Sequence, residues 1–141
     1  MTELAREVRD EINKIRRNPR CYVPKLEALL DKFDNDDDSK LFNEDDDMKR
    51  QTKDGRTAIH KAIQFLNDAE PRDALDHNDL LDRAARAHVD DIGPKGDLQN
   101  GDVKKRLLQH GRLWANYGQC IAFRFSDAEE IVCQLLVSDG L

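Results

Sequence analysis

The densest group of potential metal ligands is an acidic segment that follows the second predicted helix. Four of its carboxylates occupy positions 1, 3, 5 and 12 of a frame that resembles an EF-hand calcium-binding loop: Asp34, Asp36, Asp38 and Asp45. The match is incomplete, because Ser39 stands where that loop needs its turn glycine and Asp45 replaces the bidentate glutamate. We interpret the segment as a solvated acidic loop and keep calcium binding as the alternative.

The histidines and cysteines form no recognisable catalytic pattern. His88 lies among alanines on a predicted helix, where a neutral, hydrogen-bonded imidazole is expected, and the sequence contains no H-x-x-x-H pair. Cys21, Cys120 and Cys133 are odd in number and widely spaced, which disfavours a disulfide framework and a zinc site. We expect buried free thiols, no catalytic residue, no metal and no cofactor. A hydrolase that uses Cys120 or His88 is the least favoured alternative.

Composition and charge predict one acidic domain. The chain has 141 residues, of which 38% are hydrophobic, and its formal net charge is −6. This length and apolar content suit a single domain over residues 1–141, while the negative charge opposes binding to nucleic acid and anionic lipid. Met1 leads directly into charged residues, and no segment has the length and apolarity of a membrane span. We therefore expect a cytoplasmic protein without a signal peptide, membrane insertion or nucleic acid partner.

Periodic apolar residues predict a mainly α fold of the α+β class with about six helices and one strand. The helices are expected at about 3–16, 24–33, 57–66, 78–92, 103–111 and 126–137. Thr57, Asn78 and Ser126 are the predicted caps of three of them, and the predicted inward positions include Leu26, Phe33, Ile59 and Val132. The polar run from Asp34 to Asp54 predicts a long exposed acidic loop. Aromatic and β-branched residues around 117–125 predict the short strand. A lone strand cannot pair its own backbone groups, so we expect another strand to pair with it.

Three stretches carry family-like motifs in a fixed order. Residues 11–19 contain N-x-x-R-x-N-P, residues 80–96 contain A-x-x-H-x-x-D, and residues 131–140 end in a relative of L-x-x-D-D-G. Arg106 and Gly111 add an R-x-x-x-x-G spacing. Together they resemble the CAP superfamily of cysteine-rich secretory, antigen 5 and pathogenesis-related proteins, in particular its bacterial and protist SCP-like members. The resemblance implies an α-β-α sandwich whose first strand would be residues 117–125.

The departures from the CAP pattern concern its metal site. Many CAP proteins hold a divalent metal in a cavity with two histidines and two acidic residues. Here the corresponding loop is contracted to 97–101 and lacks a histidine, and Gln119 stands where the family motif G-E-N-I has its glutamate. The sequence also ends at Leu141, before the family's R-G-H-R segment and C-terminal strands. The resemblance therefore implies a degenerate, C-terminally truncated domain without the metal site.

The expected function is that of a non-enzymatic module. We predict a CAP-like structural or protein-binding subunit of an intracellular complex, in which a partner covers the sheet edge and helix faces that a truncated sandwich leaves open. The predicted interface contains the aromatic anchors Trp114, Tyr117, Phe123 and Phe125. A cytoskeletal or ciliary assembly would suit such a subunit. The alternative is a calcium- or lipid-binding module that uses the 34–45 loop or a remnant cavity.

Overall fold

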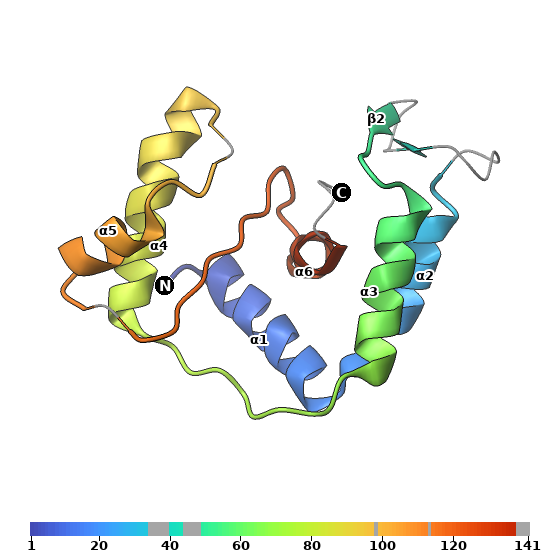
Figure 1. The fold of residues 1–141 in the computed structure, drawn as a ribbon, viewed down its shortest axis with the longest axis horizontal. Helices are drawn as coiled ribbons and strands as arrows, with labels where there is room; N and C mark the ends of the chain where they lie inside the picture. The colour runs from blue at the N-terminus through green and yellow to red at the C-terminus, as the bar shows by residue number, and fades with distance from the viewer. Residues whose placement is uncertain (34–39, 44–48, 98, 113, 138–141) are drawn as a thin grey trace. The chain divides into compact units, whose positions relative to one another are not determined.

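The computed structural model describes residues 1–33, 40–43, 49–97, 99–112 and 114–137, and within them the chain is mainly helical (Figure 1). The α-helices are α1 Glu3–Arg17, α2 Val23–Leu30, α3 Arg56–Asp68, α4 Asp79–Ile92, α5 Val103–Gln109 and α6 Ala128–Val137. Two short 3-10 helices, η1 Pro19–Tyr22 and η2 Gly93–Lys95, and the strands β1 Leu41–Asn43 and β2 Lys49–Gln51 complete the elements. The predicted mainly α, α+β class with about six helices is confirmed.

The chain divides into two compact units. The α4–α5 unit contains Met1 and residues 76–121, and the four-helix unit, built on α1, α2, α3 and α6, contains residues 2–75 and 122–141. Among the described residues, no helix is both long and apolar enough to cross a membrane. The expectation of one domain over residues 1–141 stays a prediction.

The core of the four-helix unit forms where amphipathic helices bury their apolar faces. Helix α1 packs against α6, and α3 packs against both α2 and α6. The predicted inward positions Leu26, Ile59 and Val132 are almost fully buried, which confirms the helical periodicity. The buried cluster consists of Ile15, Tyr22, Leu26, Phe33, Phe42, Ala58, Ile59, Ala62, Leu66, Val132 and Val137.

Short polar side chains determine where the helices of this unit begin. The Ala5 N–H donates to Thr2 Oγ1 at 3.1 Å, which caps α1. Helix α6 is capped by Asp127, whose Oδ1 accepts from the Glu130 N–H at 3.1 Å. The predicted cap at Ser126 is therefore wrong by one residue, because the adjacent aspartate supplies an equivalent acceptor. The cap predicted at Thr57 is also wrong, since α3 follows Gly55 at a φ of 58°.

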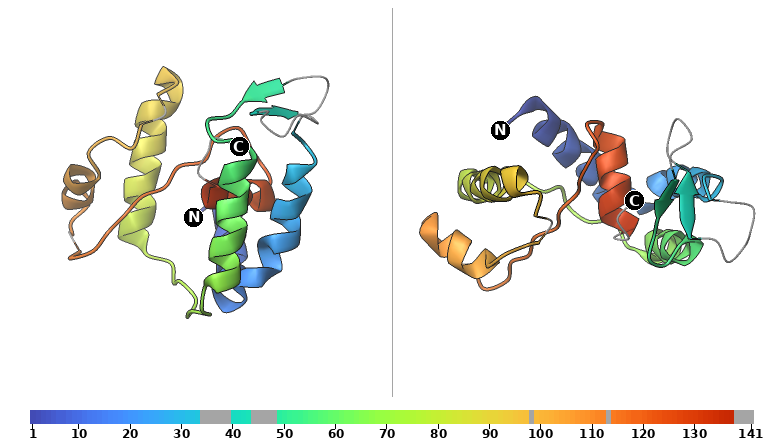
Figure 2. Two further views of the ribbon diagram at one scale, coloured as in Figure 1. Left: turned by 45° about the vertical axis from the view of Figure 1, so that its right-hand side comes forward. Right: turned by 90° about the horizontal axis from the view of Figure 1, so that it is seen from above.

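The predicted loop from Asp34 to Asp54 contains a small antiparallel pair that joins the end of α2 to the start of α3 (Figure 2). Phe42 of β1 is buried against Phe33, with ring centroids 5.4 Å apart in an edge-to-face arrangement. Phe33 lies beyond the end of α2 rather than on its predicted stripe. Three-residue strands are too short to produce a recognisable alternation of apolar and polar residues, so the sequence pattern did not predict them. Residues 34–39 and 44–48 lie outside the described part.

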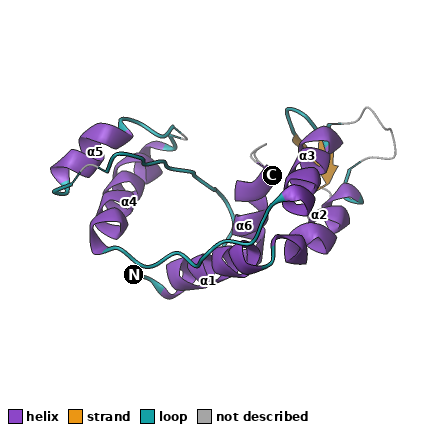
Figure 3. Ribbon diagram, turned by 60° about the horizontal axis from the view of Figure 1, so that its bottom comes forward, coloured by secondary structure: helices purple, strands orange, loops and turns teal. Residues whose placement is uncertain are grey.

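The strand predicted around 117–125 is wrong. Residues 114–127 contain no helix or strand, apart from Leu41–Asn43 and Lys49–Gln51 no strands occur in the described ranges, and Arg124 has a φ of 78° (Figure 3). Aromatic and β-branched residues indicate a fit to a pleated surface, but a strand also needs a neighbouring edge. In the described part β1 and β2 pair only with each other, apart from one isolated bridge to Phe33. The central sheet of the expected sandwich is therefore not found among these residues.

The two helices of the α4–α5 unit begin at short polar side chains. Asn78 Oδ1 accepts from the backbone N–H groups of Leu80 and Leu81, which confirms the predicted cap of α4. Helix α5 is capped by Asp102, whose Oδ1 accepts from the Lys105 N–H at 2.9 Å. The two helices pack on each other, and the buried residues in the described part of the unit are Ala84, His88, Ile92 and Leu107.

Candidate functional site

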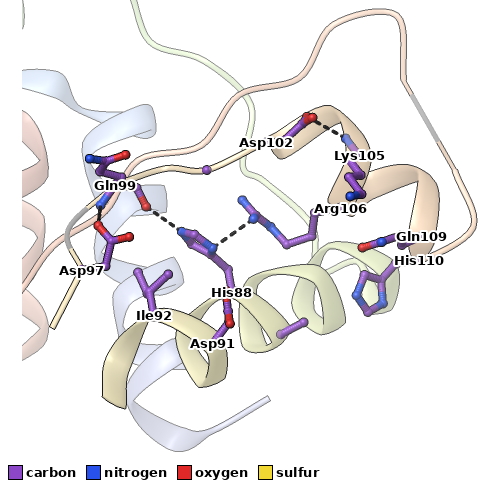
Figure 4. Close-up of a pocket in the computed structure, with 12 residues that line it drawn as sticks. His88, Asp91, Ile92, Asp97, Gln99, Asp102, Lys105, Arg106, Gln109 and His110 are labelled. Atoms are coloured by element: carbon purple, nitrogen blue, oxygen red, sulfur yellow. Dashed lines mark hydrogen bonds between the residues drawn. The ribbon is translucent and has the colours of Figure 1, made fainter. Parts of the chain in front are cut away.

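A polar pocket of about 380 Å³ lies within the α4–α5 unit, and Figure 4 shows its lining. Its walls come from the last turns of α4, the loop that follows η2, and α5. The wall contains His88, Asp91, Asp97, Gln99, Asp102, Lys105, Arg106 and His110. These residues include bases, acids and amides, so their hydrogen-bond partners decide what the pocket can do.

Arg106 connects three separate segments of the unit. Its Nη1 donates to His88 Nδ1 at 2.9 Å, and its Nη2 donates to the Asn100 carbonyl oxygen at 2.9 Å and to Gln119 Oε1 at 2.7 Å. The Gln119 amide in turn donates to Asn100 Oδ1 at 3.1 Å. We call this set of four residues the Arg106 network. It fixes a helix, a loop and the segment after α5 around one guanidinium.

The network determines the tautomer of His88. An arginine guanidinium has only donors, so His88 Nδ1 must present its lone pair to Arg106. The other ring nitrogen, Nε2, lies 2.9 Å from the Gln99 carbonyl oxygen, which can only accept. His88 is therefore a neutral imidazole with its hydrogen on Nε2, and its side chain is buried. This agrees with the buried, hydrogen-bonded histidine expected from the sequence.

Gly101 allows the loop to approach this ring. Its φ of 63° lies in the left-handed region, and a Cβ at this position would lie 3.4 Å from His88 Cε1 and 3.6 Å from Arg106 Nη1. A residue with a side chain would have both backbone strain and crowding against the imidazole. Glycine is therefore the residue type that suits the turn beside His88.

The carboxylates of the pocket already bind groups that are near them in the sequence. Asp91 pairs with Lys95 at 2.6 Å, and the hydrogen bond from Lys95 lowers the pKa of Asp91. Asp97 Oδ1 accepts from the Gln99 N–H at 3.1 Å, and Asp102 caps α5. In the described ranges, no group of three or more histidine, cysteine, aspartate or glutamate side chains could hold a metal ion.

The residues of the pocket do not fit the divalent metal that the CAP resemblance implies. A metal ion needs free lone pairs, but His88 Nδ1 and Gln119 Oε1 already accept from Arg106. The remaining imidazole nitrogen carries the hydrogen that faces Gln99. A divalent cation here would also lie beside the positive guanidinium. These groups therefore act as hydrogen-bond acceptors for Arg106 and not as ligands for a metal ion.

The predicted interface residues belong to different units. Trp114 and Tyr117 lie in the α4–α5 unit, where the Arg112 guanidinium carbon is 5.1 Å from the Trp114 ring centroid and Tyr117 is 44% exposed. Phe123 and Phe125 are half-buried residues of the four-helix unit. The structure therefore does not place all four on one strand.

Burial works against activation of the Cys21 and Cys133 thiols. Burial raises the pKa of Cys133 to about 11 and also raises the pKa of Cys21. A thiol with a raised pKa is protonated near neutral pH and is a weak nucleophile. The prediction of buried thiols is wrong for Cys120, which is exposed, and Cys21 and Cys133 are only half-buried.

Sequence reasoning missed the Arg106 network and placed its calcium alternative elsewhere. Asp34, Asp36, Asp38 and Asp45, the calcium candidates, all lie outside the described residues. Arg106 was noticed only as part of a motif spacing. The signal that could have revealed its role is the Asn100–Gly101 pair before the cap Asp102, which is typical of a tight turn that returns the chain to the helix. Comparison of the chain with protein-family models, curated proteins and solved structures finds no match.

Proposed function

We propose that the chain is a non-enzymatic, CAP-like protein-binding module that acts as a structural subunit of an intracellular assembly. The observation that supports this proposal most directly concerns the segment 114–121. With the rest of the described chain, this segment forms no backbone–backbone hydrogen bond. Its N–H and C=O groups can therefore pair with the strand of a partner.

The segment is anchored at one point and carries aromatic side chains. Gln119 attaches it to Asn100 and Arg106 through its side chain, which leaves the main chain available. Trp114 and the exposed Tyr117 are the residue types that dominate protein interfaces. An extended partner that pairs with the main chain would place its side chains against these rings.

Charge and thiol chemistry support an intracellular protein partner. The net charge of −6 opposes contact with nucleic acid and anionic lipid. Cys21, Cys120 and Cys133 are all free, which is the usual state in a reducing compartment such as the cytoplasm. We therefore place the module in the cytoplasm, where a cytoskeletal or ciliary complex would suit it.

An enzyme is less well supported, because His88 and Arg106, the base and the cation of the hydrogen-bonded network, are already occupied. Both ring nitrogens of His88 are hydrogen-bonded within the chain, and the Arg106 guanidinium has three acceptors. No observation favours the calcium or lipid alternative, so it stays a sequence-based prediction.

The test is to select extended peptides that bind the full chain from a displayed peptide library and to titrate the enriched peptides. We expect micromolar binding that slows amide exchange across the segment 114–121. The change Tyr117→Ser should weaken binding about tenfold or more, because it removes an anchoring ring. The matched control is Leu108→Ser, which removes an exposed apolar side chain from α5.

The proposal is contradicted if no peptide is enriched, or if Leu108→Ser weakens binding as much as Tyr117→Ser does. Light scattering and amide exchange of the isolated chain test whether the segment 114–121 needs a partner. If the chain alone protects the amides of 114–121 while it remains a monomer at every concentration, no partner is needed to complete this segment.

A further inference from the structure

We infer that the Arg106 guanidinium is a built-in cation that occupies the place of a metal ion and holds three segments of the α4–α5 unit together. The acceptors converge on it from three places in the sequence. His88 belongs to α4, Asn100 to the loop before α5, and Gln119 to the segment after α5. A single positive group thus cross-links elements that otherwise share few buried residues.

The chemistry of the acceptors fits a guanidinium. An imidazole nitrogen, a backbone carbonyl and a side-chain amide oxygen all receive its hydrogens at 2.7–2.9 Å, and none of the three carries a charge. Arginine spreads one charge over a planar fork with several donors, so neutral acceptors at fixed directions satisfy it. A divalent metal ion has a concentrated charge and prefers carboxylates or deprotonated ligands, which this set of three acceptors lacks.

The surroundings favour a permanent arrangement. The His88 ring is buried, and its second nitrogen is held by the Gln99 carbonyl oxygen, so the ring cannot turn without losing two hydrogen bonds. Gly101 lets the loop lie against both the ring and Arg106 Nη1. The Gln119 amide donates back to Asn100, which ties two of the acceptor-bearing segments to each other. Arg106, Asn100 and Gln119 therefore form a closed ring of hydrogen bonds.

The test is chemical rescue of the full chain. In Arg106→Ala, we expect exchange of the Gln99 and Lys105 amides, which donate to Asp97 and Asp102 beside the network, to become about 10-fold faster or more, because the charge-assisted hydrogen bonds that hold the loop and α5 in place are lost. Free guanidinium at about 50 mM, far below denaturing concentrations, should restore much of this protection by binding to the vacated acceptors. Sodium chloride at equal ionic strength should not.

Arg112→Ala is the matched control. It removes the same charge from the same unit, but Arg112 lies over the Trp114 ring and its side chain donates to none of the three acceptors. Guanidinium should give this variant no protection. Equal effects on both variants, or an Arg106→Ala chain with unchanged exchange, would overturn the inference.

Metal binding gives a second, independent readout. Calorimetric titration of the unaltered chain with Zn²⁺ should show no binding that depends on His88. Saturable micromolar binding that His88→Gln abolishes would show that the acceptors are available to a metal, and the inference would be wrong.

If Arg106→Ala does not fold, nitrogen NMR of the unaltered chain decides the question. We expect His88 with its hydrogen on Nε2 and an acceptor Nδ1, together with slowly exchanging Arg106 Nη hydrogens. The opposite tautomer or rapidly exchanging Nη hydrogens would contradict the inference. None of these measurements depends on whether the segment 114–121 binds a partner, so the two proposals can fail separately.

Discussion

Glu11 is a carboxylate of the four-helix unit that receives hydrogen bonds from two elements. Tyr22 Oη donates to Glu11 Oε2 at 2.5 Å, and Lys14, one turn later on α1, donates to Oε1. Burial alone would raise the pKa of Glu11, but the hydrogen bonds from Lys14 and Tyr22 outweigh it and hold this pKa below its usual value. Burial and the contact with Glu11 raise the pKa of Tyr22, which therefore remains a donor.

The lowered pKa of Glu11 predicts that stability falls in acid. A carboxyl whose pKa is lower in the folded state stabilises the fold above its unfolded pKa, and this contribution is lost as the pH falls through the folded value. Tyr22→Phe removes one of the donors, so we expect it to lose about 1 kcal/mol near pH 6 and to show a smaller decline in acid. Urea unfolding at several pH values measures both effects.

The control for this prediction is Tyr117→Phe, which makes the same chemical change at an exposed ring of the α4–α5 unit. Its free energy of unfolding should follow that of the unaltered chain at each pH. If Tyr22→Phe keeps the full acid-dependent loss, another carboxyl is responsible for it.

Residue types alone indicated only part of the candidate site. His88 could be assigned to a buried, neutral, hydrogen-bonded state, because its neighbours on the helix are alanines. The partner of its Nδ1 could not be assigned, because Arg106 lies 18 positions away and reaches the ring only after α5 packs on α4. Contacts of this kind depend on the folded path of the chain, which a pattern of nearby residues does not contain.

At the scale of elements, prediction succeeded where a cap, an apolar stripe and a stop signal agree. Helix α4 has all three, since Asn78 caps it, His88 and Ile92 are buried, and Gly93-Pro94 follows its last residue. It failed for the strand expected at 117–125, which has no neighbouring edge among the described residues, and for the hairpin of β1 and β2, whose strands are too short to show an alternation. A strand needs a neighbouring edge, whereas a helix satisfies its own backbone.

Two valines on helices allow the packing of the elements to be tested. Val132 on α6 is 2% exposed and Val89 on α4 is 58% exposed. Val132→Ala should lower the free energy of unfolding by about 1–2 kcal/mol, because it removes buried methyl groups and leaves a cavity. Val89→Ala should change it by less than about 0.5 kcal/mol, since little apolar surface is lost there and alanine favours helix.

Urea unfolding followed by far-ultraviolet circular dichroism measures this pair. Similar losses for both variants would mean that α4 buries Val89 under the conditions of the experiment, for example against a second copy of the chain. A concentration series of Val89→Ala would then identify such an association.

At the scale of the whole molecule, the two units differ in how much apolar surface they bury. Among the described residues, the buried apolar side chains of the α4–α5 unit are Ala84, Ile92 and Leu107, whereas the four-helix unit has an extended core cluster that includes Tyr22, Phe33 and Phe42. Hydrophobic burial is the main favourable term in folding. The smaller core therefore has less to offset the entropy of ordering its segments.

This difference predicts that the α4–α5 unit opens more easily. Under native conditions, we expect amides in the middle of α4 to exchange about 10-fold faster or more than those in the middle of α1 and α3, because local opening follows the density of buried contacts. Hydrogen–deuterium exchange followed by mass spectrometry of peptides measures it. Equal protection of both units would show that they unfold as one cooperative body.

Trp114 is a natural fluorescent probe that lies in only one of the two units. It is the only tryptophan of the 141 residues, it belongs to the α4–α5 unit, and the Arg112 guanidinium lies over its ring. Indole emission therefore reports on this unit alone, whereas ellipticity sums over the helices of both. Melting curves from the two signals need not coincide, and their separation would give the energetic coupling between the units without any labelling of the chain.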